Sequence, residues 1–364
     1  MTPHDSLPSH LLTDAIALLR AMVGVPSVTF DEAAVRDVVA QRLTEWGIAH
    51  RCVGNNILAL NRRASAALPT VMLCAHLDTV TASSGYTRDP LDPGTDPERV
   101  WGLGSNDDGG SVVAMTAAFR HFYEADDLPF NLLLALSCEE ERSGPGGAEM
   151  LWKTFDAAYR SKLAIIGEPT GGRAATSERG LLVIDGEAHG VSGHAARDEG
   201  VNALYIALED IERLRNYDFD RVSPLMGRVK LSVTQIQCGT AHNVVPDRCT
   251  FVVDIRPTEL YSNSEILELL QQECRSKLTA RNLRNRSSAT LPDSPLLAAL
   301  KTAGISTFSS PTTSDWVRTP CDAIKMGPGE SSRSHRPDEY IMVSEIERAI
   351  SDYVRVLNAL GTML

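Results

Sequence analysis

Four short apolar runs in this chain each lead into side chains of the kind that bind metal ions. The runs are residues 71–75, 132–136, 163–166 and 324–326, and the side chains that follow them are His76, Asp78, Glu139, Glu140, Glu141, Glu168 and His335. In open α/β sheets, ligands bind just outside the carboxyl ends of the strands. If the four runs are strands of one sheet, these side chains gather at one edge of it.

A glycine-rich segment between the first two runs adds two more carboxylates. Asp107 and Asp108 lie in the stretch 104–110, which opens a region of helical spacing. Two histidines and several carboxylates with few thiols suit one or two divalent ions such as zinc. Taken singly, each piece also has an ordinary explanation: a polar turn that caps a helix, or a solvated run of charge at the end of a strand.

The alternation of patterns predicts the fold of the first part of the chain. Residues 8–23 and 35–46 have the spacing of amphipathic helices, and residues 56–60 and 70–75 are typical of strands. Residues 82–100 are rich in Asp, Pro, Gly and Ser, which indicates a long loop. Strand, helix and strand then continue to Glu168, which favours an α/β fold with a mostly parallel sheet flanked by helices.

The pattern changes near residue 175, and a second domain is expected because 364 residues exceed what one core usually serves. The expected elements are strands at 181–188, 229–236 and 250–255 and helices at 202–214 and 264–278. This order is most of a ferredoxin-like α+β unit. We therefore predict a discontinuous catalytic domain, residues 1–175 and 288–364, with an inserted lid or dimerisation domain at 176–287.

Composition excludes several classes of function. The formal charge of −12 and the lack of a dense basic run argue against nucleic-acid binding. No apolar run approaches the ~20 residues that span a bilayer, and the first residues lack the pattern of a signal peptide, so a cytoplasmic location is expected. The seven cysteines are scattered without close pairs, which argues against a disulfide framework or a thiolate zinc site.

The combined pattern resembles the dinuclear zinc hydrolases that include aminoacylase, carboxypeptidase G, succinyl-diaminopimelate desuccinylase and acetylornithine deacetylase. The matching segments are CAHLDTV (74–80), GLGSNDDGG (102–110), LSCEEE (136–141), IIGEPT (165–170), GVSGHAARDEGVNA (190–203), NVVPDRCTFVVDIR (243–256) and SHRPDEY (334–340). They cover most of the chain between residues 70 and 340.

The resemblance implies two divalent metal ions, with Zn²⁺ favoured and Co²⁺ as an alternative. One ion would bind His76, Asp107 and Glu168. The other would share Asp107 and bind Glu141 and His335. By the same resemblance, Glu140 would be the general base and Asp78 would orient His76. His194, from the partner subunit of a homodimer, would contact the oxyanion.

One departure from the family leaves an alternative open. The family usually has Asp-Glu-Glu where this chain has Glu139, Glu140 and Glu141. Aligning Glu139 with the Asp makes Glu140 the general base and Glu141 the metal ligand. An alignment shifted by one residue would make Glu139 the base and Glu140 the ligand. The candidate contacts to a substrate carboxylate are Asn243, Arg256, Gly327 and Gly329, although a structural salt bridge is an equal alternative for Arg256.

Within the family, Glu at the position of Glu168 accompanies deacylases of N-acyl amino acids and carboxypeptidases. The amino-acid sequences of the segments around Asp107 and His335 are most similar to those of the acetylornithine deacetylase branch. The expected substrate is N-acetylornithine or a related N-acyl ornithine or citrulline, as in arginine biosynthesis. Succinyl-diaminopimelate or a dipeptide is the second candidate, and a non-catalytic metal-binding protein is a rival of another class.

Overall fold

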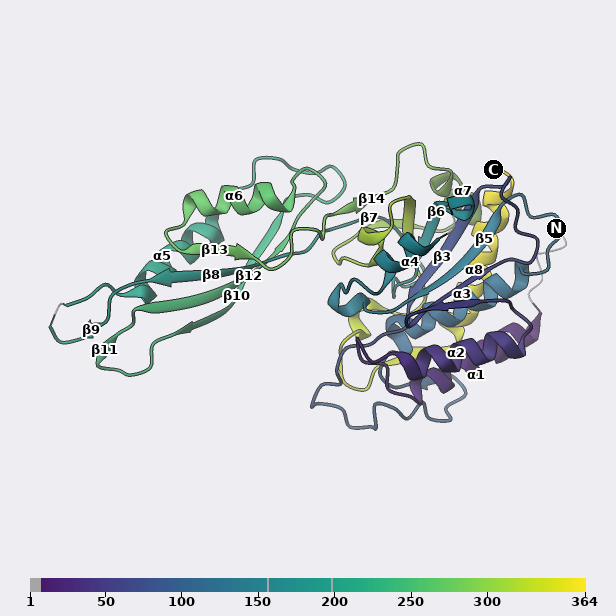
Figure 1. Cartoon of the computed structure of the whole chain (residues 1–364), viewed down its shortest axis with the longest axis horizontal. Helices are drawn as coiled ribbons and strands as arrows, with labels where there is room; N and C mark the ends of the chain where they lie inside the picture. Colours follow the sequence, from purple (N-terminus) through teal and green to yellow (C-terminus); the bar gives the residue numbers. More distant parts are fainter. Residues whose placement is uncertain (1–7, 156, 198) are drawn as a thin grey trace. The chain divides into compact units, whose positions relative to one another are not determined.

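A computed structural model describes residues 8–155, 157–197 and 199–364 of the chain. The chain forms two compact units, the first made of the residues up to 176 with 290–308 and 314–364, and the second of 177–289 with 309–313 (Figure 1). The short segment 309–313 was expected in the first unit and belongs to the second. Its place follows from hydrogen bonds to the start of that unit, since Arg179 N donates to Ser310 O at 3.1 Å.

The first unit is built on a sheet whose four central strands are parallel. The strands run in the order β1, β2, β5, β3, β6, β16, β7, and neighbours within the run β5 to β16 are parallel. Their bounds are β1 Arg51–Val53, β2 Asn56–Leu60, β3 Thr70–His76, β5 Asn131–Ser137, β6 Ser161–Ile166, β7 Ala174–Glu178 and β16 Asp322–Met326. The expected α/β class with a mostly parallel sheet is confirmed.

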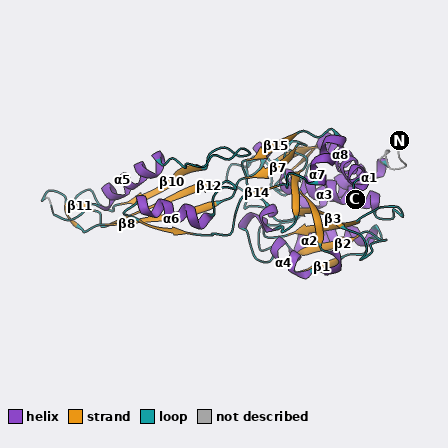
Figure 2. Ribbon diagram, turned by 90° about the horizontal axis from the view of Figure 1, so that it is seen from above, coloured by secondary structure: helices purple, strands orange, loops and turns teal. Residues whose placement is uncertain are grey.

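Helices cover both faces of this sheet, and the two faces have separate cores. Alternate residues of a strand point to opposite faces, so Val71 and Leu73 join one core while Met72 and Cys74 join the other. The larger core packs against five helices, namely α1 Ser9–Val23, α2 Ala33–Glu45, α3 Gly110–Phe122, α7 Pro295–Ala303 and α8 Val343–Gly361. The smaller core packs against α4, Ala148–Thr154, through Leu151 (Figure 2).

The second unit is a four-stranded antiparallel sheet with two helices packed on one core. The elements follow the chain order strand, helix, strand, strand, helix, strand: β8 Leu182–His189, α5 Ala203–Asn216, β10 Lys230–Cys238, β12 Arg248–Arg256, α6 Asn263–Glu273 and β13 Lys277–Ala280. The strand order across the sheet is β10, β12, β8, β13. This is the ferredoxin-like arrangement.

The helix predicted at 264–278 is wrong over its last five residues, 274–278. Helix α6 ends at Glu273, because the backbone of Cys274 is already extended. Residues 277–280 instead pair antiparallel with β8, and Leu278 enters the core of the unit. The apolar side chain that extended the helical pattern therefore belongs to the strand that completes the sheet.

None of the helices in the described part of the chain is long and apolar enough to cross a membrane.

Candidate metal centre

The expected ligands come together at the carboxyl ends of the parallel strands of the first unit. His76 is the last residue of β3, Glu141 follows β5, and Glu168 lies two residues beyond β6. Asp107 comes from the short helical segment η1, Ser105–Gly109, just before α3. His335 comes from the loop that follows β16, with a left-handed φ of 59°. Five segments far apart in the sequence thus meet at one place.

Asp107 lies between two imidazoles. Its Oδ1 is 3.3 Å from Nε2 of His76, and its Oδ2 is 3.6 Å from Nε2 of His335. Nε2 of His335 also lies 2.8 Å from Oε1 of Glu141. Ligand atoms of His76, Asp107 and Glu141 all lie within 4.8 Å of one another. A carboxylate whose two oxygens face different histidines is the arrangement needed to bridge two metal ions.

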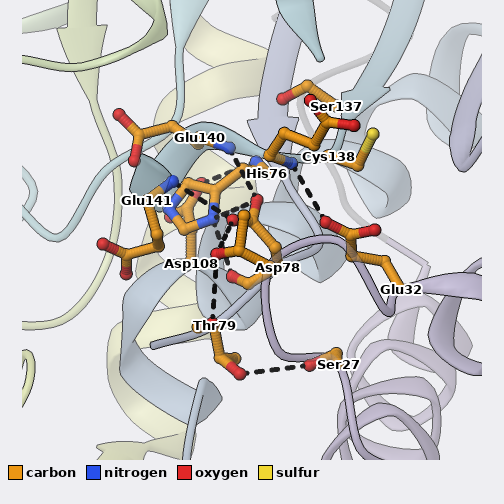
Figure 3. A network of polar contacts seen from close by, with 12 residues as sticks. Ser27, Glu32, His76, Asp78, Thr79, Asp108, Ser137, Cys138, Glu140 and Glu141 are labelled. Atoms are coloured by element: carbon orange, nitrogen blue, oxygen red, sulfur yellow. Dashed lines mark hydrogen bonds and ion pairs between the residues drawn. The ribbon is translucent and has the colours of Figure 1, made fainter. Parts of the chain in front are cut away.

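The orientation of His76 is fixed by a backbone group. Nδ1 of His76 is 2.9 Å from the carbonyl oxygen of Asp78, whereas Oδ1 of Asp78 is 3.6 Å away. The Asp78 carboxylate instead accepts hydrogen bonds from the backbone N–H of Glu140 at 2.9 Å and of Glu141 at 3.1 Å (Figure 3). Thr29 Oγ1 donates to the same carboxylate at 2.8 Å. Asp78 therefore holds the turn that carries the expected base and ligand.

The three consecutive glutamates face different partners. Glu139 has a left-handed backbone, with a φ of 60°, and its Oε2 accepts from Gly146 N at 2.8 Å. A Cβ atom at Gly144 or Gly146 would lie within 2.3 Å of a Glu139 carboxylate oxygen, so a larger residue at either position would displace this carboxylate. The Glu139 carboxylate is thus turned to the glycine loop, while the Glu141 carboxylate faces His335. This geometry favours Glu140 and Glu141 as the pair left open by the sequence.

The concentration of carboxylates explains why this site suits cations. Burial, then the charges of Glu168, Asp315 and Glu141, raises the pKa of Glu140 well above its ordinary value. Burial, then the charge of Asp107, does the same to the pKa of Glu168. Burial alone would lower the pKa of His76, but its contacts with Asp107 and Asp78 raise it well above the ordinary value. Divalent ions would relieve this repulsion, so the donor set fits them.

Glu339 is a buried carboxylate at the site that no sequence pattern singles out. Its Oε1 accepts from the backbone N–H groups of Asn106 and Asp107, each at 2.9 Å. Its side chain is 2% exposed, and burial, then the charge of Asp107, raises its pKa to about 8. Glu339 therefore links the loop of His335 to the segment that carries Asp107.

Two further charged side chains lie near the centre. Asp315 accepts a hydrogen bond from Ser137 Oγ at 2.6 Å, and burial raises its pKa to about 6. Lys325 is 1% exposed on β16, and its positive charge lowers the pKa of Glu168 against the larger effect of burial. The sequence did contain a signal for Lys325, which lies within the run 324–326. A charged side chain is rarely buried in such a run without a partner.

The glycines predicted as substrate contacts have packing roles. Gly327 O accepts from Gly172 N at 3.0 Å, and a Cβ at Gly327 would lie 2.5 Å from Glu168 O. Gly329 O accepts from Gly171 N at 2.7 Å, and its φ is 76°. Both glycines are buried. These contacts hold two loops close together at the metal centre, and a contact of either glycine with the substrate remains a prediction.

The expected residues of the second unit fall into two places. His194 and Asn243 are exposed and adjacent, because β9, Gly193–His194, pairs with β11, Val244–Val245, and Ala195 N donates to Asn243 O. Arg256 forms two hydrogen bonds with Asp254, at 2.8 and 3.1 Å. The structural salt bridge is thus the alternative that the structure shows for Arg256.

Comparison with known proteins places this site in a family. The sequence profile of Peptidase family M20/M25/M40 matches residues 72–359, which include every expected metal ligand. The chain belongs to this family. It is 27% identical over 375 aligned positions to a succinyl-diaminopimelate desuccinylase of Cereibacter sphaeroides, which covers 94% of this chain and 98% of the relative. A Corynebacterium glutamicum protein of the same name is 30% identical over 65% of this chain and 64% of its own length.

Solved structures of M20 enzymes share the fold along the whole chain. An M20 family metallo-carboxypeptidase of Sulfolobus solfataricus matches with a TM-score of 0.74 at 17% identity, covering 98% of this chain and 100% of that one. A dinuclear metal binding peptidase of the M20 family from Bacillus subtilis matches with a TM-score of 0.71 at 15% identity, covering 97% and 98%. Family membership makes the chain a metal-dependent amide hydrolase.

Proposed function

We propose that this protein hydrolyses the amide bond of an N-acyl amino acid at a dinuclear zinc centre, with Glu140 as the general base. The observation that carries the proposal is the Asp107 carboxylate, whose two oxygens face His76 and His335. Metal one would bind His76, Asp107 and Glu168, and metal two would bind Asp107, Glu141 and His335. Co²⁺ suits the same ligands.

The residues of the chain then have distinct tasks. When bound, two divalent cations supply Lewis acidity, which lowers the pKa of a water molecule and polarises the amide carbonyl. Glu140 accepts the proton of the attacking water and returns it to the amine nitrogen as the C–N bond breaks. Asp78 keeps Glu140 and Glu141 in place through their backbone N–H groups. By the family resemblance, His194 from the partner subunit of a dimer would donate a hydrogen bond to the carbonyl oxygen as negative charge develops there.

The finer proposal is that the substrate is N-acetylornithine or a related N-acyl ornithine or citrulline, as in arginine biosynthesis. It is supported by the likeness of the segments around Asp107 and His335 to the acetylornithine deacetylase branch. Succinyl-diaminopimelate is the second candidate, and the names of the relatives that align along nearly the whole chain favour it.

A panel of substrates separates these candidates. The zinc-loaded protein is assayed with N-acetylornithine, N-acetylcitrulline, N-succinylornithine, N-succinyl-diaminopimelate and a dipeptide. A preference in kcat/KM for the acetyl compounds supports the first candidate, and a preference for succinyl-diaminopimelate supports the second. If the metal-loaded protein turns over none of them, the N-acyl amino acid proposal is wrong.

We also propose that the second unit binds a second copy of the chain. Strand β10 is at the edge of its sheet, so one side of its backbone has no strand partner among the described residues. Ile236 on this strand is 46% exposed. Helix α5 packs against β10 and exposes Tyr205 and Leu208, by 64% and 48%. Such an edge invites pairing with another strand.

Light scattering after size-exclusion chromatography tests the dimer. The double variant Tyr205→Asp/Ile236→Lys should be monomeric, while the wild type elutes as a dimer. Leu225→Asp is the matched control, because Leu225 is 51% exposed elsewhere in the same unit. A monomeric wild type, or a double variant that remains dimeric, contradicts this surface.

A further inference from the structure

Two cysteines of the second unit lie directly opposite each other on neighbouring strands. Cys238 is the last residue of β10, and its register partner on the antiparallel strand β12 is Cys249. Opposed residues of antiparallel strands have Cα atoms about 4.5 or 5.5 Å apart. Disulfides form at Cα separations of roughly 4.4–6.8 Å, so the separation expected for opposed residues is compatible with a disulfide. Both thiols are free, and the two side chains are close enough to interact.

The two side chains differ in access. Cys249 is completely buried in the core of the second unit, whereas Cys238 is half-buried and packs against that core. Sγ of Cys238 also lies 3.4 Å from the carbonyl oxygen of Arg248. An exogenous reagent therefore meets Cys238 first, and Cys249 is positioned beneath it.

The two cysteines lie at the base of the loop that carries Asn243. Residues 239–247 connect the two strands, and this connection carries Asn243 and the strand β11. Strand β11 pairs with Gly193–His194. A covalent bond between Cys238 and Cys249 would tie β10 to β12 at the base of the loop 239–247. It would therefore restrict the motion of β11 and of Gly193–His194, which pairs with β11.

We propose that Cys238 and Cys249 form an oxidation site, at which a small-molecule disulfide such as glutathione disulfide drives formation of an intramolecular disulfide. The Cys238 thiolate attacks one sulfur of the reagent, so that a mixed disulfide forms and one thiolate leaves. The Cys249 thiolate then attacks Sγ of Cys238, and the second thiolate leaves. The two protein thiols lose two protons and two electrons, and the reagent is reduced to two thiols.

The buried position of Cys249 gives the reaction a signature. Burial, then the contact with Cys238, raises the pKa of the Cys249 thiol to about 12. Only thiolates attack disulfides, so the closing step should accelerate as the pH rises. This inference does not depend on the proposed enzymatic function, because the chemistry and its readout involve only the two cysteines.

The test is peptide mapping of the folded full-length protein after incubation with glutathione disulfide. We expect a peptide that joins Cys238 to Cys249, loss of both thiols from alkylation, and recovery of both after dithiothreitol. Cys238→Ser and Cys249→Ala should each abolish this peptide. Cys274→Ser is the matched control, since Cys274 is a half-buried cysteine of the same unit and should leave the linkage intact.

Three results would overturn the proposal. These are a folded protein in which Cys238 does not react, a mixed disulfide at Cys238 that persists without closing, or a linkage to any other cysteine. Because Cys238→Ser changes a half-buried side chain, circular dichroism of this variant shows that loss of the linkage is not loss of the fold.

Discussion

Replacing Glu339 by Gln should change how the stability of the metal-free protein depends on pH. The carboxyl of Glu339 has a pKa of about 8 in the folded protein, against an ordinary value of 4.5. The folded state therefore holds this proton more tightly than the unfolded state. Stability from this group is fully present below about pH 4.5 and is lost as the pH rises through about 8.

The difference between the two pKa values sets the size of the effect. It corresponds to ~5 kcal/mol at 1.36 kcal/mol for each tenfold change in proton affinity, as an upper bound. In the Glu339→Gln variant, the side-chain amide would keep an oxygen to accept from Asn106 and Asp107, but it has no proton to lose. Between about pH 5 and about pH 9, the free energy of unfolding should therefore fall by several kcal/mol less in the variant than in the wild type.

The assay is guanidinium unfolding of chelator-treated protein across this range. His335, with a pKa raised to about 9 by its hydrogen bond to Glu141, contributes in the same direction and remains in both proteins. Glu330→Gln, an exposed position in the same loop, is the control and should behave as the wild type does. Equal pH dependence of Glu339→Gln and wild type would refute the reasoning, because Glu339 would then not be held in the site as described.

Three further predictions concern the metal centre itself. Glu140→Gln should retain the metals, measured by elemental analysis, and its kcat should fall at least ~10²–10⁴-fold. Glu139→Gln is the control and should retain activity. The reverse result would identify Glu139 as the base. Asp78→Asn should weaken metal binding by about 10–100-fold in a chelator competition, because the amide NH2 would face one of the two backbone N–H groups that the carboxylate accepts from. Unchanged affinity and kcat would contradict its role. Chelation should abolish hydrolysis, and Zn²⁺ or Co²⁺ should restore it; activity that survives complete metal removal would contradict a metal-dependent reaction.

Parallel strands explain why the sequence alone predicts that the candidate ligands lie close together. Their carboxyl ends meet at one edge of the sheet, so runs that end in His76, Glu141 and Glu168 place those residues together even though other segments separate them. The segment of Asp107 could be placed for a similar reason, since its glycines open α3 beside the same edge.

The supporting groups could not be predicted, because they depend on local backbone geometry. The left-handed conformation of Glu139 turns its carboxylate away from the centre, and no pattern in three identical residues indicates which one turns. Asp78 was expected to orient His76. The nearest group to Nδ1 of His76 is the Asp78 backbone carbonyl, at 2.9 Å, and the Asp78 carboxylate lies 3.6 Å away. Glu339 acts on backbone N–H groups more than 200 positions earlier in the chain, a contact that only tertiary structure reveals.

Anomalous diffraction at the zinc absorption edge, from crystals of the zinc-loaded protein, tests the dinuclear centre most directly. The prediction is two peaks, one on each side of the Asp107 carboxylate, the first beside His76 and Glu168 and the second beside Glu141 and His335. A single peak, or peaks that do not contact Asp107, would contradict the bridged pair of ions from which the proposed function is derived.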